Sequence, residues 1–188
     1  KFQPDAGQEE CDPCAAGKFA AGEGNTTCTD CPAGTTQADS GEDACDPCAA
    51  GRHAPSTGMT ACLDCALGTY AAGTATVDCA ECEAGQYTPA GGATGCMPCP
   101  RGRIAPTSAH GQPRCIACAA GQYTPVSADA SKGATACSDC AAGSFSATEA
   151  WDQDCAPCAA GTYQKATGQS ACADCPRGTS SSALGRTT

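Results

Sequence analysis

Large apolar side chains are scarce in this sequence. Aromatic residues make up 4% of the 188 residues, with one tryptophan. The hydrophobic fraction is 41%, but alanine and the 20 cysteines supply most of it. Because burial of large apolar surface drives the folding of ordinary domains, these side chains cannot build one large core. Covalent cross-links must replace it.

Basic residues and long apolar runs are also few. The sequence has 10 Lys and Arg but 20 Asp and Glu, which gives a net charge of -10. This charge excludes a nucleic-acid partner, because binding to phosphates requires clustered basic residues. Residues 1–94 carry net -11 and residues 95–188 net +1. No apolar run approaches the roughly 18 residues of a membrane helix. We therefore predict no membrane insertion by this segment.

Catalytic residue sets are missing. The two histidines, His53 and His110, are 57 residues apart and have no nucleophile or metal ligand at motif spacing. The clustered carboxylates lack the order of a calcium-binding EF-hand and are interpreted as solvated loop charge. These carboxylates are Asp39, Glu42, Asp43, Asp46, Glu149, Asp152 and Asp154. We predict a protein that is not an enzyme and has no cofactor and no bound metal.

Cysteine, in contrast, is abundant and periodic. All 20 cysteines fall in ten Cys-x-x-Cys pairs, whose starts are 17 to 22 residues apart. The pairs begin at Cys11, Cys28, Cys45, Cys62, Cys79, Cys96, Cys115, Cys137, Cys155 and Cys172. Such self-similarity is typical of stacked repeat arrays. We predict small disulfide-rich repeats in an elongated solenoid or rod of short β-hairpins and turns, with little or no helix and no single large core.

Each repeat has a glycine three residues after its second cysteine. In Cys31-Pro32-Ala33-Gly34 the order predicts a turn with proline second and glycine last. Two residues after the glycine lies an aromatic position, whose ring we expect over a neighbouring disulfide. Its aromatic occupants are Phe2, Phe19, Tyr70, Tyr87, Tyr123, Phe145 and Tyr163, and Thr36, His53, Ile104 and Ser180 fill it elsewhere.

Repeat lengths predict four segments. Residues 1–10 are a partial repeat, and 11–95 hold five regular repeats of 17 residues. Residues 96–154 hold three longer repeats with inserted loops at 105–114, 124–136 and 146–154, and 155–188 hold two regular repeats, the last cut before its closing cysteine. We expect the chain to be a segment of a longer array. Trp151, in the third insertion, is a candidate partner contact, since tryptophan is enriched at binding hot spots.

The repeat narrows the disulfide pairing without fixing it. If the second cysteine of each pair bonds the first of the next, each bond closes a loop of about 15 residues, worth roughly 3 kcal/mol. The predicted bonds are Cys14–Cys28, Cys31–Cys45, Cys48–Cys62, Cys65–Cys79, Cys82–Cys96, Cys99–Cys115, Cys118–Cys137, Cys140–Cys155 and Cys158–Cys172, with Cys11 and Cys175 unpaired within this segment. A second pairing scheme, with Cys11 bonded to Cys28 and Cys14 bonded to Cys31, is an open alternative. Disulfides within one Cys-x-x-Cys are disfavoured because they are labile.

Two other uses of Cys-x-x-Cys fit less well. Paired motifs form zinc ribbons, but zinc modules usually bring basic residues and an intracellular setting. No strand-helix-strand pattern supports a thioredoxin-like redox site. A disulfide scaffold persists in oxidising compartments, so we predict a secreted, extracellular or cell-surface protein. Asn25, in Asn25-Thr26-Thr27, is then a predicted N-glycosylation site.

The motif Cys-x-x-Cys-Pro-x-Gly-Thr, at residues 28–35 and 172–179, resembles the ephrin-receptor-like cysteine-rich repeat, a relative of the tumour-necrosis-factor-receptor module. The likeness covers essentially the whole chain. It implies elongated, disulfide-laddered ectodomains, as in protist surface antigens and algal flagellar-hair (mastigoneme) proteins. Departures are the high alanine content and the Ala-Ala or Ala-Leu that replaces Pro-x before several glycines.

Two functions remain open. The favoured hypothesis is a structural subunit of an extracellular filament, flagellar hair or surface coat, whose partners are other copies or other extracellular proteins. The alternative is a stalk or ligand-binding ectodomain of a receptor or adhesin, whose loops between residues 105 and 154 dock a protein partner. The repeat indicates fold and compartment more strongly than either function.

Overall fold

A computed structural model describes residues 11–106, 111–125 and 132–187. The chain forms two compact units, one of residues 1–82 with 88–96 and one of residues 83–87 with 97–188. The predicted partial repeat at 1–10, with Phe2, lies outside the described residues, as do His110 and parts of two inserted loops. The described residues form no helix, and their strands make two-stranded antiparallel hairpins. The predicted class of small disulfide-rich repeats is confirmed.

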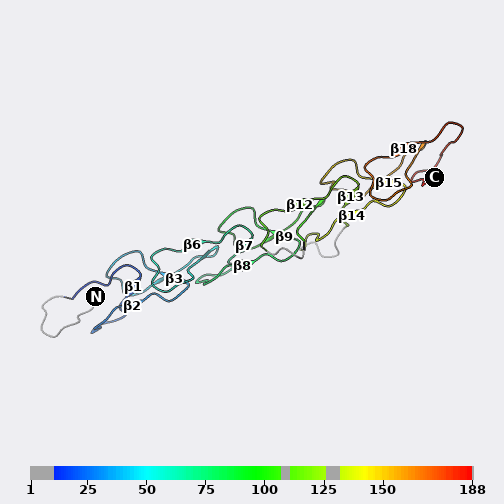
Figure 1. Ribbon diagram of the computed structural model, residues 1–188. Helices are drawn as coiled ribbons and strands as arrows, with labels where there is room; N and C mark the ends of the chain where they lie inside the picture. Colours follow the sequence, from blue (N-terminus) through cyan, green and yellow to red (C-terminus); the bar gives the residue numbers. More distant parts are fainter. Residues whose placement is uncertain (1–10, 107–110, 126–131, 188) are drawn as a thin grey trace. The chain divides into compact units, whose positions relative to one another are not determined.

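The described residues of the first unit form four hairpins, each of which joins two consecutive strands in antiparallel register; several of these strands are labelled in Figure 1. The pairs are β1 with β2, β3 with β4, β5 with β6 and β7 with β8. Their bounds are β1 Lys18–Phe19, β2 Thr29–Asp30, β3 Thr35–Thr36, β4 Asp46–Pro47, β5 Arg52–His53, β6 Leu63–Asp64, β7 Thr69–Tyr70 and β8 Ala80–Glu81.

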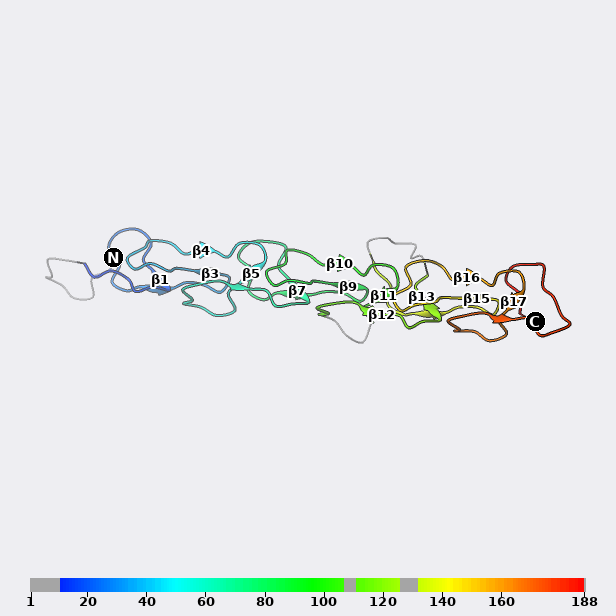
Figure 2. The same ribbon diagram turned by 90° about the horizontal axis from the view of Figure 1, so that it is seen from above.

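In the second unit, residues 83–87, 97–106, 111–125 and 132–187 repeat this arrangement in five hairpins, and several of their strands are labelled in Figure 2. The pairs are β9 with β10, β11 with β12, β13 with β14, β15 with β16 and β17 with β18. Their bounds are β9 Gln86–Tyr87, β10 Met97–Pro98, β11 Arg103–Ile104, β12 Ile116–Ala117, β13 Gln122–Tyr123, β14 Ser138–Asp139, β15 Ser144–Phe145, β16 Ala156–Pro157, β17 Thr162–Tyr163 and β18 Ala173–Asp174.

A tight turn sets the start of each hairpin. The Thr35 N–H donates to the Pro32 carbonyl at 3.1 Å, and Gly34 has φ of +88°. Proline is therefore first and glycine third in this turn, one place later than the predicted register. Glycine at the third place with positive φ is the type II requirement. The strand of Thr and an aromatic or β-branched residue follows directly, since such residues favour extended backbone.

Disulfides join the second cysteine of each pair to the first cysteine of the next pair. The described bonds are Cys14–Cys28, Cys31–Cys45, Cys48–Cys62, Cys65–Cys79, Cys82–Cys96, Cys99–Cys115, Cys118–Cys137, Cys140–Cys155 and Cys158–Cys172. Cys11 and Cys175 are free. These pairs follow the unit-to-unit scheme. We call the loop closed by one disulfide a repeat and name it by that bond.

The buried interior of each repeat consists of sulfur and small side chains. The second cysteines that form the described disulfides are buried, with Cys14, Cys31 and Cys48 at 0% exposure. The rings at the aromatic position are only half-buried, as for Phe19 and Tyr70. The disulfides therefore carry the role that bulky apolar residues play in a larger core.

Backbone hydrogen bonds join successive repeats within the first unit. The Gly17 N–H donates to the Gln37 carbonyl and the Gly34 N–H to the Ala54 carbonyl, both at 2.8 Å. In return, the Gly58 N–H donates to the Cys31 carbonyl at 2.8 Å. Because these donors and acceptors recur at the repeat spacing, each repeat presents the same backbone groups to the next.

Candidate functional site

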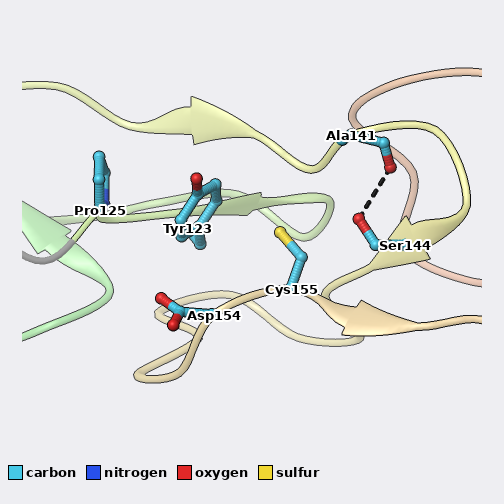
Figure 3. A pocket seen from close by; sticks show the side chains of 6 residues that line it. All are labelled: Tyr123, Pro125, Ala141, Ser144, Asp154 and Cys155. Carbon is cyan, nitrogen blue, oxygen red and sulfur yellow. Dashed lines mark hydrogen bonds between the residues drawn. The ribbon is translucent and has the colours of Figure 1, made fainter. Parts of the chain in front are cut away.

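A groove lies where the aromatic position of one repeat meets the disulfide of the next (Figure 3). In the second unit, Tyr123 extends from β13 toward Cys155, whose sulfur belongs to the Cys140–Cys155 bond. The groove is completed by Pro125, Ala141, Ser144 and Asp154. The Ser144 hydroxyl donates to the Ala141 carbonyl at 2.8 Å, which fixes the turn on one side.

Equivalent residues line grooves elsewhere in the second unit. Tyr87 lies with Pro100, Arg103 and Cys115, and it packs against the buried Cys99–Cys115 bond. Tyr163 lies with Cys175, Pro176 and Thr179, with the Lys165 ammonium 5.6 Å from its ring centre. For Tyr87 the predicted contact between an aromatic residue and the neighbouring disulfide is confirmed, and that disulfide belongs to the following repeat. Tyr123 shares its groove with a cysteine of the following repeat.

Residues that replace the aromatic make the same contact in the first unit. The Thr36 hydroxyl is 3.5 Å from the Cys62 sulfur, in the bond that follows its own repeat. A ring nitrogen of His53 lies within 4.8 Å of the sulfurs of Cys65 and Cys79, which are bonded to each other. The contact therefore depends on position in the repeat, whether or not the side chain is aromatic.

The sequence reading missed a second buried position, directly after the aromatic one. Ala54, Ala105 and Ser146 are at 0% exposure. Thr88 and Thr124 are also buried, and their hydroxyls accept the N–H of Gly68 and Gly102 at 2.6 Å and 2.8 Å. A small residue occupies this position in most repeats, and that recurrence could have indicated burial. The aromatic position beside it was interpreted as the buried one instead.

The repeated glycine meets the backbone of the repeat two positions along. A Cβ placed on Gly51 would lie 2.2 Å from the Gly92 carbonyl oxygen, and Gly51 has φ of +84°. A side chain at this place is therefore excluded both by backbone conformation and by space. The contact shows that repeats in the first unit pack against their second neighbours as well as their first.

The third insertion is organised around Asp154. The Asp154 carboxylate pairs with the Arg101 guanidinium at 2.6 Å, and the Asp154 carbonyl accepts the Trp151 indole N–H at 3.1 Å. Ala150 has φ of +54°, which leads the chain into this turn. Trp151 is half-buried, and its indole N–H, the one polar group of the side chain, donates within its own loop.

The predicted glycosylation residue lies in a well-defined turn. The Asn25 side-chain amide donates to the carbonyls of Ala21 and Gly22 at 2.9 Å and 3.1 Å. Thr26 and Thr27 beside it are exposed. When an oligosaccharide is attached, the Asn25 amide nitrogen keeps one of its two hydrogens. It can then donate one of these two hydrogen bonds.

One group of potential metal ligands occurs among the described residues, namely His53, Cys65 and Cys79. Since Cys65 and Cys79 share a disulfide, neither offers a thiolate, and the group cannot bind a metal in this state. No described segment is a helix long and apolar enough to cross a membrane.

Hairpins of two-residue strands, one disulfide each, and a core of sulfur define a cysteine-rich repeat module of the ectodomain type. A family model described as tyrosine-protein kinase ephrin type A/B receptor-like matches residues 1–42, 68–109 and 143–187. The chain belongs to this ephrin-receptor-like family. A comparison with curated proteins finds no match. The family and the disulfides together indicate an extracellular or cell-surface location.

Proposed function

We propose that this chain is a non-catalytic structural subunit of an extracellular filament, flagellar hair or surface coat. The observation that carries the proposal is the set of backbone hydrogen bonds that recurs between successive repeats. In the first unit, glycine N–H groups at 17, 34 and 51 donate to the next repeat at 2.8 Å each. Because the same contacts between neighbouring repeats supply the stability, repeats can be added without a new core. This property suits a protein whose role depends on its length.

Charge and surface support self-association as the mode of assembly. Residues 1–94 carry net -11 and residues 95–188 net +1, so contact between unlike ends is less repulsive than contact between the acidic ends. Head-to-tail contacts that do not close into a ring propagate as filaments. Small side chains allow close approach between neighbouring molecules. The partners are then other copies of the chain or other extracellular proteins.

Negative-stain microscopy of the purified native protein tests this proposal. Filaments or ordered mats are expected at low ionic strength, with fewer at high salt because the charge contribution is screened. Monodisperse short particles under all conditions would contradict it. The variant Arg177→Gln/Arg186→Gln should reduce assembly, since it removes two positive charges from residues 95–188 and changes their net charge from +1 to -1. The control Ser56→Glu/Thr57→Glu changes the net charge equally at exposed positions in the acidic half and should not reduce it.

We also propose that the subunit is a glycoprotein modified at Asn25. The turn around Asn25 leaves Thr27, the threonine of the Asn-x-Thr motif, exposed for recognition. Treatment of the native protein with an amidase that removes N-linked glycans should lower its mass and convert Asn25 to Asp. An unchanged peptide mass at Asn25 would refute the modification.

The partner contact at Trp151 remains a proposal, and with it the alternative role as a receptor or adhesin stalk. Trp151 exposes part of its indole on the insertion that Arg101 and Asp154 hold in place. Under that role, Trp151→Ala should abolish binding to an extracellular partner while the disulfide pattern is retained. Unchanged affinity would remove Trp151 from the interface.

A further inference from the structure

His53 occupies the aromatic position of the Cys48–Cys62 repeat and differs chemically from the other described occupants. Its side chain lies over the Cys65–Cys79 disulfide, and one ring nitrogen and the two sulfurs are all within 4.8 Å of one another. The Nδ1 atom is buried and has no hydrogen-bond partner among the described residues. A buried ring nitrogen without a partner is costly, and a metal ion would satisfy it.

Backbone contacts to other repeats position His53 and Cys65 independently of the disulfide. His53 pairs with Leu63 across β5 and β6 and bridges to Thr76. The Cys65 N–H donates to the Gly51 carbonyl, and the Cys65 carbonyl accepts the Gly92 N–H, both at 2.9 Å. If the sulfur–sulfur bond is broken, these contacts keep His53, Cys65 and the segment before Cys79 close together.

We propose that His53, Cys65 and Cys79 form a latent binding site for Zn²⁺ or a similar thiolate-binding divalent ion, closed by the disulfide and opened by a small thiol. Two thiol molecules reduce the bond, giving two cysteine thiols and one small-molecule disulfide. The metal then displaces two protons and binds two thiolates and one imidazole nitrogen, with water as the fourth ligand.

The geometry suits a tetrahedral ion. Zinc–sulfur bonds of about 2.3 Å and zinc–nitrogen bonds of about 2.0 Å place ligand atoms roughly 3.5–3.8 Å apart. The three donors already lie within 4.8 Å of one another, so small side-chain rotations suffice. Cys79 is only half-buried, which gives the thiol and the ion a route from solvent. The other described occupants of the aromatic position in the first unit are Phe19, Thr36 and Tyr70, none of which is a comparable ligand.

Mass action links the metal to reduction, and this linkage provides the test. The full chain, with Cys11 and Cys175 first blocked by a maleimide, is equilibrated in a reduced and oxidised glutathione buffer with and without Zn²⁺. Free thiols are then trapped in acid and mapped by mass spectrometry. Zn²⁺ at about ten times its dissociation constant should raise the ratio of reduced to oxidised Cys65–Cys79 about tenfold. Co²⁺ in place of Zn²⁺ should give a thiolate-to-metal absorption band.

Two variants keep the proposal falsifiable. His53→Tyr introduces the residue found at 70, 87, 123 and 163 and should abolish the Zn²⁺-dependent increase. Thr36→His should create the same response at Cys48–Cys62, because the Thr36 hydroxyl is 3.5 Å from the Cys62 sulfur. No Zn²⁺-dependent increase at Cys65 and Cys79, or an equal increase in His53→Tyr, would overturn the proposal.

Discussion

At the residue scale, the recurring glycine is the most constrained position in the chain. Its recurrence predicts a turn, and the turn is present, although glycine is third and not last. The sequence could not reveal a second constraint, which is the close approach of a backbone carbonyl from the second repeat along the chain. That carbonyl leaves no space for a side chain at the glycine. That contact joins residues 41 apart, such as Gly51 and Gly92, and no local pattern encodes it.

Gly51→Ala separates these two constraints when compared with Gly22→Ala. Both glycines have positive φ, +84° and +75°, but nothing lies within 4 Å of a Cβ on Gly22. Gly22→Ala should cost about 1–2 kcal/mol from backbone strain alone. Gly51→Ala should cost at least about 3 kcal/mol, because Gly92 must also move. Denaturant unfolding with the disulfides intact measures both. Equal losses would show that the close approach contributes nothing.

At the element scale, each hairpin is too short to persist alone. Strands of two residues make few hydrogen bonds, and isolated hairpins are marginal even when longer. The sequence predicted short hairpins around these turns, since tyrosine and threonine favour extended backbone. It did not reveal that the small residue after the aromatic is buried, since alanine and threonine are common at both exposed and buried sites in this chain.

Removal of one disulfide should therefore act locally. Cys31→Ala/Cys45→Ala should open the β3–β4 hairpin, with a loss of roughly 3 kcal/mol for a loop of this length. Native-state hydrogen exchange provides the measurement. The Cys48 N–H, bonded to the Gly34 carbonyl at 3.0 Å, should lose protection.

The Cys158 N–H serves as an internal control, because it is bonded to the Gly143 carbonyl at 2.8 Å in the second unit. Its exchange should be unchanged by the Cys31→Ala/Cys45→Ala substitution. An equal loss of protection at Cys48 and Cys158 would instead indicate one cooperative core, contrary to the repeat description.

At the scale of the whole molecule, the cysteine count and period carried the prediction of class and compartment. They did so because large apolar residues are too few for any other source of stability. Function is less accessible from sequence, since the same repeat serves as a spacer in proteins with different roles. The His53 cluster was also hidden, because His53 and Cys79 are 26 residues apart and become neighbours only when consecutive repeats stack.

The central claim is that each repeat is closed by the second cysteine of one pair and the first of the next. Peptide mapping of the native protein without reduction tests this claim most directly. The account predicts cross-linked peptides containing Cys14–Cys28, Cys31–Cys45 and each later pair in the same register. Peptides that link Cys11 to Cys28 and Cys14 to Cys31, or that close single Cys-x-x-Cys motifs, would contradict it.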